Sequence, residues 1–217
     1  KSCKIHYMSQ PQINDSLVQL AKSGKTVVRL KGGDPFMFGR GGEEAEALAE
    51  AAIPFEIVPA VSAASGCSSY TGIPLTHRDY SSRVQYITGH LKKDDLERLD
   101  WRGLADEDST LVVYMGLANA AHIAEMLITY GLVSSTPYAA IEQGTSHAQR
   151  VIKGPISSMA EELLKHDIKS PTLLIIGKVV TLSEKLDWFN TPSSSPVREM
   201  SREQIFSRPH KRESSQQ

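Results

Sequence analysis

The stretch RLKGGDPFMFGRGGEE, residues 29–44, holds five of the chain's fifteen glycines. It follows the short β-like run TVVRLK (26–31) and leads into EEAEALAEAA (43–52), a run of strong helix formers. Glycine allows sharp turns and lets a ligand approach the backbone closely. The stretch therefore predicts a strand, then a glycine-rich turn with exposed backbone groups, then a helix.

The same alternation of segments continues on both sides of this stretch. Apolar residues at Ile13, Leu17, Leu20 and Ala21 have the spacing of one helix face and predict a helix over 12–23. Further strands are predicted at 54–59, 84–89, 110–116, 137–144 and 172–180, and further helices around 123–130 and 156–166. Strands that alternate with helices are typical of α/β folds with parallel sheets.

The pattern divides the chain into a partial N-terminal α/β domain (1–79), a C-terminal α/β domain (80–190) and a disordered tail (191–217). GIPLTHRDYSSR (72–83) lacks periodicity and is the predicted linker. The tail contains seven serines and three prolines and too few apolar residues to form a core. Because the first domain opens with a helix that leads into a strand, we expect that an earlier strand is missing and that the chain is a fragment.

Five predicted strands end in glycine, at positions 32, 89, 116, 144 and 177. Any one of them is explained by glycine simply ending a strand, but together they favour a ligand cleft at the carboxyl ends of the strands. The glycines match neither a phosphate-binding loop nor a dinucleotide fingerprint. Asp34 suits a ligand with an amine or hydroxyl groups, although an ordinary Asp-Pro turn explains it equally well.

Composition excludes several classes of protein. The net charge is −1 overall, and it is −3 without the tail, which carries +2, so no basic face for nucleic acid is expected. The two cysteines lie far apart and the histidines lack ligand spacing, so no metal site is predicted. No apolar run reaches the ~18 residues of a membrane span, and we expect a cytoplasmic protein without a membrane partner.

The glycine-rich stretch closely resembles the signature of the uroporphyrinogen-III C-methyltransferase family, within the wider tetrapyrrole methylases. The resemblance continues through IPFEIVPAVSAASGCSSYTGIPLTHRD, ITGHLK, TLVVYMG, EQGT and SPTLLIIGKVV, and covers residues 10–189. It implies two α/β domains with S-adenosyl-L-methionine in the cleft between them, in a homodimer. The implied reaction is the transfer of two methyl groups to uroporphyrinogen III, which gives precorrin-2 for sirohaem and cobalamin.

The resemblance also implies roles for individual residues. The implied cofactor contacts are Gly32, Gly33, Asp34, Met37, Ser62, Ala63, Met115 and Gly144. His77 and Arg78 are the candidates for binding the substrate's carboxylates, together with Arg40 and Lys92. The family's catalytic lysine aligns with Lys1, and its aspartate base has no counterpart in this chain. Ala60 replaces a usual glycine, and a left-handed backbone there would cost roughly 1 kcal/mol.

Two functions of different classes remain open at this point. One is an active methyltransferase of which this chain is a part. The other is a truncated, non-catalytic subunit that binds the cofactor or forms a dimer.

Overall fold

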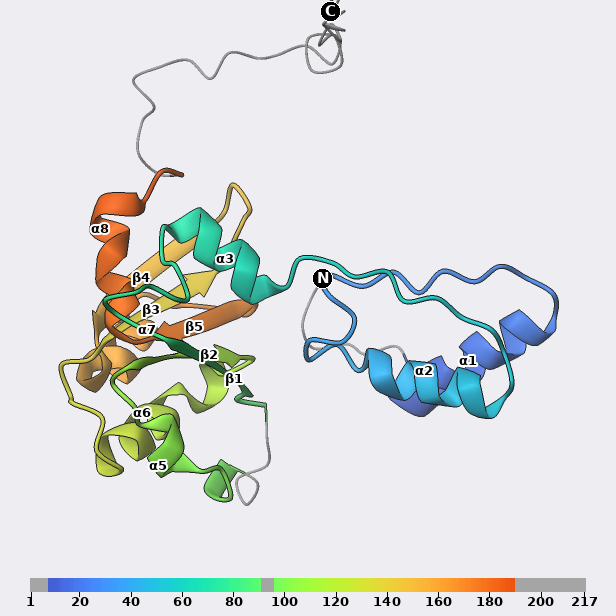
Figure 1. Ribbon diagram of the computed structural model, residues 1–217, viewed down its shortest axis with the longest axis horizontal. Coiled ribbons are helices and arrows are strands. Elements are labelled where there is room, and N and C mark those ends of the chain that lie inside the picture. Colours follow the sequence, from blue (N-terminus) through green and yellow to red (C-terminus); the bar gives the residue numbers. More distant parts are fainter. Residues whose placement is uncertain (1–7, 91–95, 190–217) are drawn as a thin grey trace, which may run out of the picture.

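The computed structural model describes residues 8–90 and 96–189. These residues form a larger body around a five-stranded sheet and a smaller lobe with two helices and two long extended segments (Figure 1). The predicted tail and Lys1 lie outside the described residues. Among the described residues, no helix is long and apolar enough to cross a membrane.

The smaller lobe contains helices α1 (Gln10–Lys22) and α2 (Gly41–Glu50), which pack against each other. Ser9 caps α1, and its backbone N–H donates to the Gln12 side chain at 2.7 Å, which completes a capping box. Both predicted helices are therefore confirmed, with ends within about two residues of the expected ones.

The predicted strands at 26–31 and 54–59 are not strands among the described residues. Both segments are extended, but neither has a strand partner. A strand exists only through hydrogen bonds to a neighbour, and no described residue supplies them here. The sequence pattern was correct about the extended backbone and wrong about the pairing.

The sheet of the body is mixed rather than parallel, which corrects the prediction. Its order is β1 (Arg83–Thr88), β2 (Ser109–Tyr114), β5 (Thr172–Ile176), β3 (Pro137–Glu142) and β4 (Arg150–Pro155). Only β1 and β2 run parallel, and the other three pairs are antiparallel. The loop from β3 to β4, residues 143–149, is too short for the crossover that parallel pairing needs.

Helices cover both faces of this sheet. On one face lie α5 (Trp101–Leu104), α6 (Ala120–Thr129) and α7 (Met159–Lys165), with the short 3₁₀ helices η1 (Leu117–Asn119) and η2 (Ile156–Ser158). The other face holds α3 (Ala63–Thr71), η3 (Lys178–Leu182) and α8 (Ser183–Leu186) (Figure 1). Side chains of β2 alternate between the two cores: Leu111 and Val113 join one, Val112 and Tyr114 the other.

Helix α3 packs on the sheet of the body rather than on the smaller lobe. Its Ala64 and Cys67 are buried in the same core as Ile175, and Ile73 in the predicted linker is fully buried there too. Judged by these contacts, the chain therefore passes from the smaller lobe to the body before α3 begins. The domain boundary at residue 79 stays a prediction.

Candidate functional site

Asp34 joins the carboxyl ends of the two extended segments. One carboxylate oxygen accepts the N–H of Phe36 at 2.9 Å, and the other accepts the N–H of Ala60 at 3.1 Å. Ala60 is not among the residues with positive φ, so the strain expected from its replacement of glycine is absent. The aspartate thus shapes its own turn and holds the neighbouring turn against it.

The glycines of the turn serve two purposes. Added Cβ atoms at Gly39 and Gly41 would lie 2.8 and 2.5 Å from the carbonyl oxygen of Pro35, and the Gly41 N–H donates to that oxygen at 3.0 Å. These two glycines let the turn fold back on itself. Gly32 has no atom within 4 Å of such a Cβ. At Gly32 the missing side chain leaves open backbone surface.

The start of α3 connects this turn to the sheet. Ser62 is the N-cap of α3, and its hydroxyl accepts the Ser65 N–H at 3.4 Å. The preceding amide in the first turn, that of Ala64, donates to the phenolic oxygen of Tyr114 at 3.1 Å. Since Tyr114 is the last residue of β2, α3 begins directly beside the carboxyl end of a central strand.

Aromatic packing brings the glycine-rich turn to the same strand end. The ring of Phe38 lies 4.8 Å from the ring of Tyr114, and Met37 packs against the core that contains Tyr114. Met115 follows and is half exposed. A cavity of about 440 Å³ opens here, lined by the turn, by Thr88 at the end of β1 and by Met115.

Unusual backbone conformations gather at the glycine-rich turn and at the carboxyl ends of β2 and β3. Seven non-glycine residues in the described part of the chain have positive φ. Five of them lie in the glycine-rich turn or directly after β2 and β3, namely Phe38, Arg40, Met115, Gln143 and Thr145. Such conformations are costly and cluster at functional sites. They support a binding role for these strand ends.

Gly144 is needed for packing against α3. A Cβ at this position would lie 2.3 Å from the sulfur of Cys67. Burial raises the pKa of the Cys67 thiol to about 11, so the thiol stays protonated and inert near neutral pH. The close contact places the loop after β3 beside the middle of α3, on the side of the sheet that carries Tyr114.

The comparisons with known proteins agree with this geometry. The sequence model of the tetrapyrrole (corrin/porphyrin) methylase family matches residues 2–160 of this chain. The chain belongs to this family. The resemblance and the α/β fold class predicted from the sequence are thereby confirmed.

Relatives of this chain include longer proteins. Siroheme synthase 2 of Yersinia enterocolitica is 56% identical over 186 residues, which are 86% of this chain and 39% of the relative. The siroheme synthase of Pseudomonas putida is 54% identical over 184 residues, 85% of this chain and 39% of the relative. The chain thus spans about two fifths of the length of the curated relatives it matches.

Solved structures show the same fold. A uroporphyrin-III C-methyltransferase from Thermus thermophilus, in complex with S-adenosyl homocysteine, matches with a TM-score of 0.69 and 34% identity, over 80% of this chain and 75% of that one. A cobalt precorrin-4 methyltransferase has a TM-score of 0.71 at 19% identity, covering 83% and 74%, and shows the fold alone.

The structure of this chain brings the eight predicted cofactor residues into one chain of contacts. Gly32, Gly33, Asp34 and Met37 lie in the glycine-rich turn, and Asp34 bonds to the segment that leads into Ser62 and Ala63. Helix α3 then links this segment to Tyr114, before Met115, and to Gly144. Their role in holding a cofactor is not tested by these contacts and stays a prediction.

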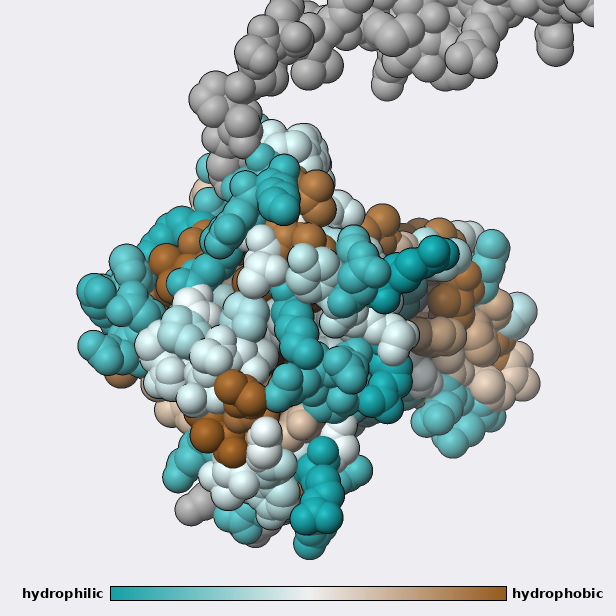
Figure 2. Space-filling model, turned by 60° about the vertical axis from the view of Figure 1, so that its left-hand side comes forward, coloured by the Kyte–Doolittle hydropathy of each residue, from teal (hydrophilic) through white to brown (hydrophobic). Residues whose placement is uncertain are grey.

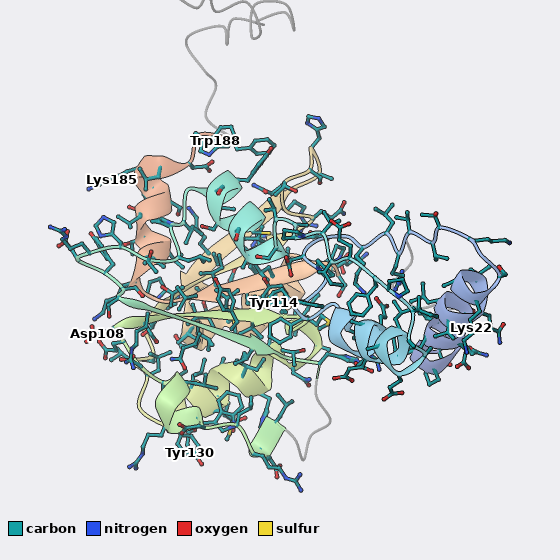
Figure 3. The ribbon with its side chains drawn as sticks, turned by 45° about the vertical axis from the view of Figure 1, so that its right-hand side comes forward. Lys22, Asp108, Tyr114, Tyr130, Lys185 and Trp188 are labelled. Atoms are coloured by element: carbon teal, nitrogen blue, oxygen red, sulfur yellow. The ribbon has the colours of Figure 1, made fainter. Side chains whose placement is uncertain are left out.

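His77 and Arg78 lie elsewhere in the structure. They belong to the turn before β1, where the N–H of Ser82 donates to the carbonyl of Asp108 at 3.3 Å. Asp108 and Tyr114 stand at opposite ends of β2 (Figure 3). Six residues of strand span about 20 Å. The structure therefore does not bring this pair to the cavity, and their contact with substrate stays a prediction.

Arg40 and Lys92 were the other two basic candidates for binding the substrate. Arg40 lies at the cavity, but it is paired with Glu43 through contacts of 2.8 and 2.7 Å. The hydrogen bond from Arg40 lowers the pKa of Glu43. Lys92 lies outside the described residues, as does Lys1.

Sequence reasoning missed two residues that organise the site. Tyr114 anchors both α3 and Phe38, and its signal was an aromatic residue at the end of a strand, just before Met115. Glu44 is 5% exposed and accepts hydrogen bonds from Lys31, Arg29 and Gln10. Burial opposes its ionisation, but these hydrogen bonds outweigh that effect and lower its pKa. A glutamate within an acidic helix start gave no sign of this.

Proposed function

We propose that this chain binds S-adenosyl-L-methionine and forms the methyltransferase part of an enzyme that converts uroporphyrinogen III to precorrin-2 by two C-methylations. The observation that carries the proposal is the meeting of the glycine-rich turn, the start of α3 and the end of β2 around Asp34 and Tyr114. The similarity to siroheme synthases and to a uroporphyrin-III C-methyltransferase complexed with S-adenosyl homocysteine supports the same activity.

The residues at this place fit such a cofactor. Gly32 leaves open backbone, the Ser62 hydroxyl caps the start of α3, and Met115 is half exposed and carries a soft thioether. When bound, the cofactor supplies a methyl group already activated by a positively charged sulfur. The transfer of the methyl group from sulfur therefore needs no strongly charged side chain to activate it, and a base is needed only for the proton that the methylated substrate then loses.

The chain's own residues then have to exclude water and align the partners. Phe36, Phe38 and Met115 line the cavity with apolar surface. Such surface keeps water from the reacting groups and leaves the sulfur charge poorly solvated, which favours its loss on transfer. The hydrogen bonds of Asp34 hold the two turns in fixed positions, and fixed positions are the main source of rate in a reaction between two bound molecules. Lys1 remains our candidate for the catalytic lysine.

Gly32 offers a sharp test of cofactor binding. Its φ is not positive and no atom lies within 4 Å of an added Cβ, so Gly32→Val should leave the fold intact and fill the space where the cofactor would lie. We expect calorimetric titration with S-adenosylhomocysteine to show binding to the chain and a loss of about tenfold or more in the variant. Ala49→Val, at an exposed position of α2, is the matched control and should bind normally.

The proposal fails if the folded chain does not bind S-adenosylhomocysteine, or if Gly32→Val binds as tightly as Ala49→Val. Thermal unfolding of both variants shows whether a loss of binding reflects a loss of fold.

A turnover assay distinguishes the second candidate function, that of a non-catalytic subunit, from that of an enzyme. The chain is mixed with uroporphyrinogen III and S-adenosyl-L-methionine, and methylated products are followed by mass spectrometry. Transfer of two methyl groups supports the enzyme. Cofactor binding without any transfer supports the subunit that only binds the cofactor or forms a dimer.

A homodimer and a cytoplasmic location are further parts of the proposal. The first rests on the family resemblance and the second on the composition of the sequence. Light scattering after size-exclusion chromatography tests the dimer, and fractionation of cells that express the protein tests the location.

A further inference from the structure

The loop from β3 to β4, residues 143–149, lies along helix α3 (Figure 1). Two glycines allow this close approach. A Cβ added to Gly66 in α3 would lie 3.1 Å from Cγ2 of Thr145, and one added to Gly144 in the loop would overlap the sulfur of Cys67. Glycine is unfavourable inside a helix. The contact with Thr145 explains why glycine stands at position 66.

Apolar burial does not hold this loop in its conformation. Its sequence, QGTSHAQ, contains no large apolar side chain, and most of its residues are exposed. Hydrophilic and neutral residues of this kind cover most of the visible face of the body, with apolar areas between them (Figure 2). The conformation of the loop therefore depends on its hydrogen bonds.

Thr145 has a costly backbone conformation within this loop. Its φ is +68°, in the left-handed region. A β-branched residue is rarely found there, because its Cβ substituents crowd the backbone. Such a conformation persists only where the surrounding structure holds it. The loop must therefore contain a group that keeps Thr145 in place.

The side chain of Gln149 is that group. Its Oε1 accepts the backbone N–H of Thr145 at 2.8 Å, and no backbone carbonyl among the described residues accepts this N–H. Its Nε2 donates to the backbone carbonyl of Tyr70 in α3 at 3.4 Å. One side-chain amide thus holds Thr145 with its acceptor and α3 with its donor.

The other hydrogen bonds of the loop do not replace this link. The N–H of Gln143 donates to the carbonyl of Pro171 at 3.0 Å, and the Ser146 hydroxyl donates to the carbonyl of Gln143 at 2.7 Å. These bonds shape the start of the loop. Within residues 8–90 and 96–189, the only hydrogen bond that joins the loop to α3 is the one from Gln149 to Tyr70.

We propose that Gln149 is a positioning residue for cofactor binding, which holds Thr145 in the left-handed conformation and keeps the loop with Gly144 seated on α3. This inference rests on the proposed function, in which Gly144 and the start of α3 contact S-adenosyl-L-methionine. Ser62 and Ala63 stand at that start. Gln149 therefore sets the position of one group of cofactor contacts relative to the other, without a contact of its own.

Replacement of the side-chain amide tests the proposal. Gln149→Met keeps the length of the side chain and loses both hydrogen bonds, so calorimetric titration with S-adenosylhomocysteine should show a loss of affinity of about tenfold or more. Gln149→Glu keeps an oxygen acceptor for Thr145 and should restore part of that affinity. His147→Ala, at an exposed position of the same loop, is the matched control and should bind like the original chain.

A second variant separates positioning from general stabilisation. Glycine adopts a positive φ without strain, so Thr145→Gly removes the need for a group that holds this residue. In the Thr145→Gly chain, Gln149→Met should therefore cost clearly less affinity than in the original chain, about threefold or less. A residue that only stabilises the fold would give the same factor in both chains.

Hydrogen exchange tests the same link without any cofactor. The backbone amide of Thr145 should exchange about tenfold or more rapidly in Gln149→Met, whereas amides of β2 should not change. Thermal unfolding shows whether the variants are folded. Should Gln149→Met not fold, Gln149→Asn takes its place, because its side-chain amide is one carbon too short to reach both partners.

Three results would overturn the proposal alone. They are equal affinity of Gln149→Met and His147→Ala, the same loss of affinity with and without Thr145→Gly, and unchanged exchange of the Thr145 amide in Gln149→Met. If the original chain does not bind S-adenosylhomocysteine, the proposed function fails, and this inference fails with it. The two failures are therefore distinguishable.

Discussion

The carboxylate of Asp34 accepts a hydrogen bond of 3.1 Å from the backbone of Ala60, 26 residues further along the chain. The bond joins the carboxyl ends of two segments that no strand ladder connects among the described residues. Asp34 therefore works first as a brace between two turns. Any contact with a cofactor is made by a carboxylate that is already positioned by two backbone groups.

Removal of this brace should affect stability and binding together. Asp34→Ala loses both hydrogen bonds, and we expect the free energy of unfolding to fall by roughly 1–3 kcal/mol. Asp34→Asn keeps one oxygen acceptor and should lose less. Denaturant unfolding and titration with S-adenosylhomocysteine measure the two effects. Unchanged stability in Asp34→Ala would show that the hydrogen bond to Ala60 is not important.

The ring pair of Phe38 and Tyr114 should couple the glycine-rich turn to β2. A double-mutant cycle of Phe38→Ala and Tyr114→Ala is expected to give an interaction free energy of roughly 0.5–1.5 kcal/mol in unfolding experiments. Tyr114→Phe keeps the ring and loses only the hydrogen bond from Ala64, so its coupling to Phe38 should remain. Strictly additive effects would mean that the two rings do not hold the turn.

Because Gly144 lies against Cys67, a methyl group added at position 144 should destabilise the fold. Gly144→Ala places a Cβ on the Cys67 sulfur and should cost roughly 1–3 kcal/mol of stability. Cys67→Ala makes room, so the double variant should be less destabilised than the sum of the two single variants. Gly42→Ala is the matched control, because it lies in α2 with no atom near its Cβ, and it should stabilise slightly.

Glu44 should make the smaller lobe sensitive to acid. Its pKa in the folded protein is below the ordinary value of 4.5, so its contribution to stability is present above that pH and is lost as the pH falls below it. Glu44→Gln should cost roughly 1.5–3 kcal/mol at neutral pH and weaken the acid dependence. Unfolding between pH 7 and pH 3 measures this. Glu50→Gln, at an exposed position of α2, should behave like the original chain.

Local patterns were sufficient for most of the secondary structure. Helix α1, helix α2 and strand β2 were predicted because a helix face or an apolar strand is encoded by neighbouring residues. Strand β4 was missed because its half-exposed, polar sequence RVIKGP lacks an apolar pattern. The antiparallel pairs were missed because strand order depends on how loops of different length close, which no local window contains.

The sequence predicted which residues form the candidate site but not how they contact one another. The motifs named the glycine-rich turn, Ser62, Met115 and Gly144, and the structure places them in one chain of contacts. They did not show that Tyr114 ties these parts together, because its partners Phe38 and Ala64 are distant in sequence. They also suggested His77 and Arg78, which lie near the far end of β2.

The sequence alone determined the family, the helices and the extended character of residues 26–31 and 54–59, since these depend on residue type and short-range spacing. Only the tertiary structure decided which of those segments become strands, which glycines are required by packing and how Tyr114 ties the glycine-rich turn to α3. The physical reason is that strand pairing and side-chain contact are relations between distant residues. An extended segment becomes a strand only when another backbone lies beside it.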